Sequence, residues 1–207
     1  MNKHPSKVIA SMRELMPARA LEDHEARGIA ERQATRFLEI FSITEPSVDV
    51  GLICELPRVR VRTEPTLADS GLTYWDKGKW VVGINRNDSQ TRRRFSLGHE
   101  FKHILDHPFI GTIYSDERGK PSPKRAELMC DWFAACLLMP RPWVKRLWTR
   151  GVQDVAILAA MFNVSPAAMS VRLQELGLVE PRGRWRRKRS ERAYFREAPV
   201  TAVVLAA

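Results

Sequence analysis

The sequence predicts an α+β fold in which several helices surround one small β-sheet. Apolar residues recur at spacings of three and four over residues 26–41, which indicates an amphipathic helix. Residues 49–84 then change to the alternating pattern of β-strands, and further helices are predicted over about 90–106 and 124–138. With 207 residues, 44% of them hydrophobic, the chain is long enough to bury a core of its own.

The N-terminal part of the chain is expected to be helical. Residues 8–41 carry the helical pattern, and Pro17 separates a short first helix from a longer second one. Residues 43–47 are rich in turn formers and act as a linker. We therefore expect residues 1–45 to form a helical segment that packs on the rest of the protein.

The predicted sheet follows this segment. Val59 and Val61 alternate with polar residues and indicate a first strand. Residues 72–75 and 80–84 flank an Asp-Lys-Gly turn, which predicts a β-hairpin. Turn and capping residues then lead into the helix over 90–106.

The second half of the chain alternates between loop and helix. Residues 108–123 contain Gly, Pro and Ser punctuation and are expected to form a long loop, which we interpret as controlling access to a site. The helix over 124–138 ends before Pro140. Two short helices are expected within 152–178, and they resemble a helix-turn-helix. This organisation predicts a core domain over 46–148 and a helical subdomain over 149–179.

The positive charge of the chain is concentrated near its C-terminus. The formal net charge is +10, and residues 181–197 contain eight Arg or Lys against two Glu. We expect residues 180–207 to form a basic, disordered tail. This tail is the candidate nucleic-acid contact, through residues whose shared feature is positive charge: Arg184, Arg186, Arg187, Lys188 and Arg189.

Composition narrows the class of protein further. The sequence has no run of about 18 apolar residues, so no membrane partner is expected. It has three cysteines, and its first residues lack the pattern of a signal peptide. Together these observations favour a cytoplasmic protein.

The sharpest signal of function is an HExxH pattern in the predicted helix over 90–106. His99 and His103 are four residues apart, which places their side chains about 40° apart and about 6 Å along one helix face. Two imidazoles in this arrangement can bind one Zn²⁺. Glu100 lies one step around the helix, where its carboxylate can act as general base toward a zinc-activated water.

A catalytic zinc needs a third protein ligand. His107 extends the spacing of the two histidines, but it would lie about 12 Å along the axis from His99 in a continuous helix. Glu127 and Asp131 are better candidates because they are four residues apart on one face of the next helix. One can bind the metal while the other orients a histidine, and the spacing does not decide which does which.

These segments resemble the ImmA/IrrE family of bacterial metallopeptidases. The matching sequences are RRRFSLGHEFKHILDH at 92–107 and ELMCDWFAACLLMP at 127–140, with Gly98 and Cys130 where the family usually has Ala. The resemblance implies a zincin-like metallopeptidase core with one Zn²⁺, for which Mn²⁺ could substitute. It also implies roles for the five site residues: metal ligands His99, His103 and Glu127, general base Glu100, and neighbouring Asp131.

The resemblance further implies the kind of partner. Members act on a protein, often a helix-turn-helix repressor or antitoxin encoded nearby, in phage or mobile-element regulation. A DNA-binding regulator that uses residues 155–176 and the basic tail is the alternative. We prefer packing against the core as the role of 155–176, because Arg172, Gln174 and Glu175 are its few long polar residues in the second helix. Tyr74, Tyr114 and 92–94 are open candidates for oxyanion stabilisation.

Overall fold

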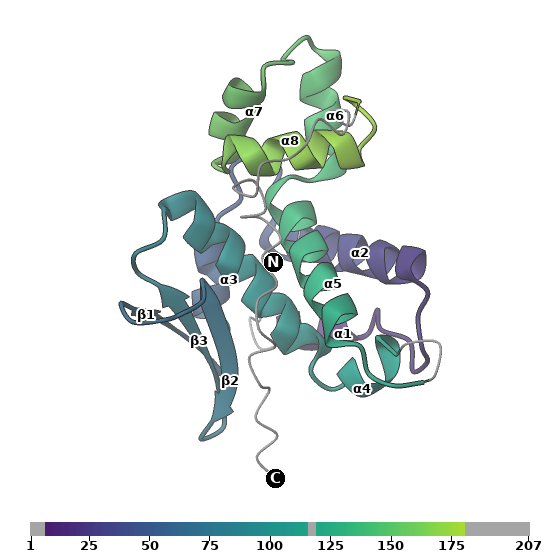
Figure 1. Cartoon of the computed structure of the whole chain (residues 1–207), viewed down its shortest axis with the longest axis vertical. Coiled ribbons are helices and arrows are strands. Elements are labelled where there is room, and N and C mark those ends of the chain that lie inside the picture. Colours follow the sequence, from purple (N-terminus) through teal and green to yellow (C-terminus); the bar gives the residue numbers. More distant parts are fainter. Residues whose placement is uncertain (1–6, 116–118, 181–207) are drawn as a thin grey trace.

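The computed structural model describes residues 7–115 and 119–180, and it confirms the α+β class. A three-stranded sheet stands beside a set of helices, and α3 lies between the sheet and α5 (Figure 1). The predicted basic residues Arg184, Arg186, Arg187, Lys188 and Arg189 lie outside the described residues.

Two helices form the N-terminal part, as predicted. They are α1 (Val8–Arg13) and α2 (Asp23–Phe41). The second begins at a capping box, in which the Glu22 and Glu25 side chains each accept a backbone N–H at the opposite end of the first turn. Its apolar stripe packs against α5. A 3₁₀ helix, η2 (Val50–Glu55), then leads into the sheet.

The sheet contains β1 (Val59–Glu64), β2 (Gly71–Asp76) and β3 (Lys79–Asn85) in the order β1-β3-β2. β3 pairs in parallel with β1 and antiparallel with β2, so the predicted hairpin is confirmed and β2 is an edge strand. The hairpin turn places Lys77 and Gly78 at φ of 44° and 79°, and positive φ at both central positions is what a type I′ turn requires.

Helix α3 (Gln90–Asp106) has the predicted bounds and begins at Ser89, whose hydroxyl accepts the backbone N–H of Arg92. It packs on the sheet and crosses α5 (Pro123–Leu138). At the crossing, a Cβ built on Gly98 would lie 3.4 Å from the Cβ of Ala134. These two small residues allow the helices to approach closely beside the histidines of α3.

Two helices occur where none was expected. α4 (Ile110–Ile113) interrupts the predicted loop over 108–123, and Ser115 and Pro121 form a β-bridge that closes it. The loop prediction was therefore wrong for its first half, where Ile113 and Tyr114 are buried against α2 and α5. α6 (Arg141–Thr149) begins directly after Pro140, which ends α5 and precedes the first turn of α6.

The C-terminal helices are α7 (Val155–Phe162) and α8 (Pro166–Glu175), which are bent by 104° relative to each other. Asp154 and Ser165 cap their N-termini. The angle is typical of a helix-turn-helix. Within the described ranges, no single helix is long and apolar enough to cross a membrane, although this bent pair would satisfy length and composition together.

Candidate metal centre and active site

Two helices bring three metal-binding side chains together. On α3, the Nε2 atoms of His99 and His103 lie 3.2 Å apart. On α5, one carboxylate oxygen of Glu127 lies 3.2 Å from Nε2 of His99, and the other lies 3.4 Å from Nε2 of His103. Ligand atoms bound tetrahedrally at 2.0–2.1 Å are separated by roughly 3.3 Å, and each of these separations is close to that value, so the residues present are of the kind and spacing that can hold a zinc ion.

The remaining imidazole nitrogens face other residues of α5. Nδ1 of His99 lies 2.8 Å from a carboxylate oxygen of Asp131, and Nδ1 of His103 lies 3.5 Å from Sγ of Cys130. Glu127 and Asp131 therefore face different sides of His99: Glu127 faces the two Nε2 atoms, and Asp131 faces Nδ1 of His99.

Cys130 gives the centre a second candidate set. His99, His103 and Cys130 each offer one ligand atom within 4.8 Å of one another. The thiol lies next to Nδ1 of His103, however, whereas the paired nitrogens are Nε2 atoms. The sequence gave no sign of the contact between this buried thiol and His103.

The pKa values of the two histidines are shifted in opposite directions. Burial disfavours the imidazolium form of His99, but the hydrogen bonds to Asp131 and Glu127 raise its pKa to about 10. Burial and the nearby charge of His99 lower the pKa of His103. Burial would raise the pKa of Glu127, yet its bond to His99 leaves that pKa below the ordinary value. The cluster is thus electrostatically suited to a cation at His99 and Glu127.

The edge strand β2 fixes the carboxylate of Glu100. The hydroxyl of Thr73 donates to Oε2 of Glu100 at 2.7 Å. On the other side, a Cβ built on Gly71 would lie 2.7 Å from Oε1, so the backbone of β2 approaches this side chain without room for a methyl group. Neither residue was predicted. The only sequence signal was a glycine at the start of the strand.

Several candidate residues lie elsewhere. The Tyr114 hydroxyl donates to Asp106 at 2.5 Å and is buried, and Asp106 also binds Lys102 in the same buried cluster. Arg94 donates to the backbone carbonyls of Val48 and Asn163. These contacts give Tyr114 and Arg94 structural roles.

His107 and Tyr74 lie beside the hairpin and on it. The His107 ring makes an edge-to-face contact with Trp80, with centroids 4.8 Å apart. Tyr74 is 45% exposed on β2. Of the residues considered for the oxyanion, it is the one on the edge strand.

The helix-turn-helix-like pair is packed on the core. Arg172 of α8 is fully buried, and its Nε donates to the carbonyl of Met139 at 3.1 Å. Met169 and Leu173 of the same helix are also fully buried. A recognition helix must present its long polar side chains to DNA, and Arg172 is not available for this contact.

Fold and site together define a zincin-like α+β protein. The chain belongs to the family described as the IrrE N-terminal-like domain, a peptidase family whose profile matches residues 54–174.

Two relatives are similar to part of this chain. The radiation response metalloprotease IrrE of Deinococcus deserti is 32% identical over 79 residues, which cover 37% of this chain and 28% of that protein. The uncharacterized immunity region protein 2 of Bacillus phage phi105 is 35% identical over 74 residues, which cover 36% of this chain and 46% of the phage protein. The chain therefore matches less than half the length of either relative.

A solved structure shares the fold. A Mycobacterium tuberculosis transcriptional regulator superposes on this chain with a TM-score of 0.56 at 16% identity. The superposition covers 81% of this chain and 51% of the regulator.

Proposed function

We propose that this protein is a metal-dependent endopeptidase in which His99, His103 and Glu127 bind one Zn²⁺ and Glu100 is the general base. The observation that carries the proposal is a cluster of ligand atoms next to the buried carboxylate of Glu100: the two Nε2 atoms lie 3.2 Å apart, and the two oxygens of Glu127 lie 3.2 Å and 3.4 Å from them. Zinc, when bound, supplies Lewis acidity that makes a water molecule nucleophilic near neutral pH.

Glu127 is preferred to Cys130 as the third ligand. Its carboxylate faces both Nε2 atoms, whereas the thiol faces Nδ1 of His103. Burial also raises the pKa of Cys130 well above the ordinary value, which disfavours the thiolate that a metal requires. Cys130 then serves as the neighbour of the second ring nitrogen of His103.

Asp131 orients the metal-binding side chain of His99, and Thr73 orients the general base Glu100. Asp131 accepts the Nδ1–H of His99, which leaves the Nε2 lone pair free for the metal. Thr73 donates to Oε2 of Glu100, so that Oε1 remains to accept a proton from the attacking water. As the C–N bond breaks, the same oxygen can deliver that proton to the nitrogen of the leaving amine.

The proposed substrate is a protein segment in extended conformation. β2 has a free edge within the described part of the chain, and it carries the exposed side chains of Tyr74 and Trp75. An extended segment can pair with such an edge through main-chain hydrogen bonds. The name of the phage relative supports a substrate from an immunity region, and we propose a helix-turn-helix repressor encoded nearby.

The proposed compartment is the reducing cytoplasm. All three cysteines are free: Cys54, Cys130 and Cys136. Free thiols persist where the compartment keeps them reduced, which supports this placement.

The proposal is tested by separating metal binding from hydrolysis. Zinc-loaded wild type, Glu100→Gln and His103→Ala are each incubated with the repressor encoded next to the gene and with a proteome-derived peptide library. Cleavage is mapped by mass spectrometry, and bound metal is measured by elemental analysis. We expect Glu100→Gln to retain zinc and lose at least about 10²-fold in rate, because it lacks the proton acceptor.

His103→Ala is expected to lose both zinc and activity. Glu39→Gln, an exposed change on α2, is the matched control and should behave as wild type. Full activity in Glu100→Gln would refute the mechanism.

A further inference from the structure

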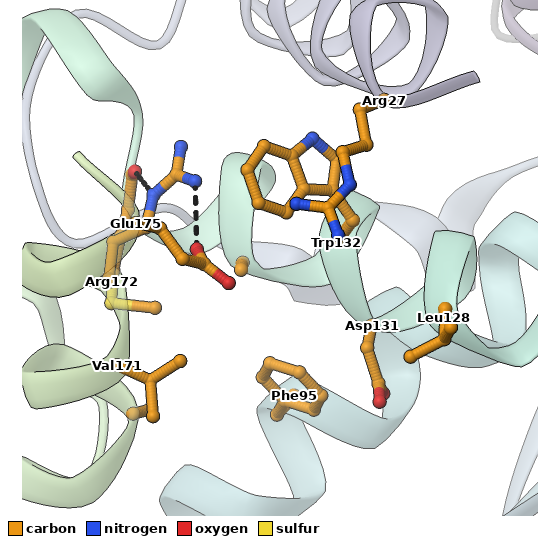
Figure 2. Close-up of a pocket in the computed structure, with 11 residues that line it drawn as sticks. Arg27, Phe95, Leu128, Asp131, Trp132, Val171, Arg172 and Glu175 are labelled. Atoms are coloured by element: carbon orange, nitrogen blue, oxygen red, sulfur yellow. Dashed lines mark hydrogen bonds and ion pairs between the residues drawn. The ribbon is translucent and has the colours of Figure 1, made fainter. Parts of the chain in front are cut away.

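A small pocket lies where α8 meets α3 and α5. Its volume is about 110 Å³ (Figure 2). A single buried water needs roughly 10–15 Å³ of cavity volume, so the pocket has room for a group of several atoms. Its walls are mainly apolar: Phe95 from α3, Leu128, Trp132 and Ala135 from α5, and Val171 from α8.

The pocket adjoins the candidate metal centre. Asp131 lines it, and the same carboxylate lies 2.8 Å from Nδ1 of His99. Leu128 follows Glu127 in the sequence, and Phe95 lies one helical turn before His99. A residue with its backbone next to the metal ligands could therefore reach the pocket with its side chain.

The direction of β2 determines which substrate residue that would be. Three contacts show that β2 and α3 run side by side in the same direction. Arg92 donates to Ser70 before β2, and Glu100 accepts from Thr73. At the far end, the His107 ring meets Trp80 edge to face, and Trp80 pairs with Trp75 near the end of β2.

A substrate strand antiparallel to β2 runs in the opposite direction, which is the commoner arrangement of paired strands. It passes the hairpin end first, then Glu100, and then the N-terminal half of α3. The residues that follow the scissile bond are thus placed toward Phe95 and the pocket.

We propose that this pocket receives the side chain of the substrate residue immediately after the scissile bond, and that it selects a large apolar residue such as Leu, Ile, Met or Phe. The inference rests on the proposed function, which supplies the scissile bond beside Glu100. It gives α8 a part in substrate selection, since one wall of the pocket comes from this helix.

The charged groups at the pocket support an apolar occupant, because they contact other protein groups: the Arg27 guanidinium lies 4.5 Å from the ring centroid of Trp132, whose indole N–H is the one buried lining polar group without a hydrogen-bond partner among the described residues. Arg172 donates to Met139 and to Sγ of Cys136, and its Nη1 lies 3.2 Å from Glu175. Figure 2 shows this pair on one side of the open space and Asp131 on the other. Because Asp131 binds His99, neither carboxylate requires a charged ligand.

The first test is a comparison of cleavage sites in the full-length protein. Zinc-loaded wild type, Val171→Trp, Val171→Ala and the control Ile157→Trp are profiled on the same peptide library. Ile157 is 55% exposed on α7, so its change alters the helical pair away from the pocket. Wild type is expected to prefer Leu over Ala after the cut by about 10- to 100-fold in kcat/KM.

Val171→Trp should reduce this preference at least tenfold, and Ile157→Trp should keep it. Val171→Ala enlarges the pocket and should favour Phe over Leu, which provides a readout even if the tryptophan variant fails to fold. An unchanged Leu-to-Ala ratio in both Val171 variants would overturn the inference. A change in preference confined to the substrate residue before the scissile bond would also overturn it.

The second test measures occupancy without catalysis. Leucinamide, which mimics the new N-terminal residue of a product, is titrated into ¹⁵N-labelled protein while the indole N–H signal of Trp132 is followed. A saturable shift with leucinamide but not glycinamide is expected in wild type and Ile157→Trp, and it should be lost in Val171→Trp. A wild type without this shift would overturn the pocket assignment. A shift without any cleavage would support the pocket and count against the proposed function.

Discussion

Replacement of Gly71 by alanine tests how closely β2 constrains the proposed general base. The added Cβ would lie 2.7 Å from Oε1, 2.9 Å from Cγ and 3.1 Å from Cδ of Glu100. Ordinary contacts begin at 3.4 Å, so the carboxylate oxygen must move by 0.7 Å. The strand itself can keep its conformation, because the crowded atoms belong to a flexible side chain.

The expected effect is a loss of activity with little loss of stability. A misplacement of about 1 Å costs about 10²-fold in rate, so a 0.7 Å shift should lower kcat/KM by roughly 10- to 100-fold. This corresponds to about 1.4–2.7 kcal/mol of transition-state stabilisation. The free energy of unfolding should change by less than about 1 kcal/mol.

The assay compares Gly71→Ala with Gly83→Ala on the neighbouring strand. At Gly83 the added Cβ would meet Leu72 at 3.4 Å, which is an ordinary contact. Cleavage of one mapped peptide gives kcat/KM, urea denaturation gives stability, and elemental analysis gives the zinc content. Gly83→Ala should stay within about twofold of wild type. Equal activity in the two variants would refute the idea that β2 positions Glu100.

Other residues give three further predictions. Asp131→Asn should weaken zinc binding by about 10- to 100-fold, because Asp131 holds the ring of His99; competition with a chromogenic chelator measures this, and unchanged affinity would contradict the role. Arg172→Met should lower the free energy of unfolding, measured by urea denaturation, by about 3 kcal/mol, because it removes a buried cation from its hydrogen-bond partners. A loss below about 1 kcal/mol would contradict a stabilising role for these contacts. Iodoacetamide at pH 8 should label the exposed Cys54 first, whereas Cys136, whose pKa burial raises to about 11, should react only after unfolding, as peptide mapping would reveal.

The elements of the site were predictable where the information is local. The bounds of α3 follow from Ser89 as its cap and from its helical pattern, and the spacing of His99 and His103 gives a shared helix face without knowledge of the fold. The hairpin follows from a turn sequence. Each of these signals involves residues only a few positions apart.

The remaining features depend on contacts between distant segments. Glu127 and Asp131 share one face of α5, and only the crossing with α3 distinguishes their positions relative to His99. The bond from Thr73 to Glu100 depends on how the edge strand lies on the helix. α4 is only four residues long, which is too short for a periodic pattern to reveal.

The close crossing of α3 and α5 has a consequence for which sequences can keep this site. Gly98 and Ala134 leave space for one methyl group at the contact and for nothing larger, since a Cβ on Gly98 already reaches 3.4 Å. A branched side chain at either position would force the two helices apart. The histidines belong to one helix and Glu127 to the other, so the proposed metal centre would be pulled apart even if all three residues were retained. The tolerance of the proposed metal centre to sequence change is therefore set partly by two small residues, Gly98 and Ala134, that are not among its candidate ligands.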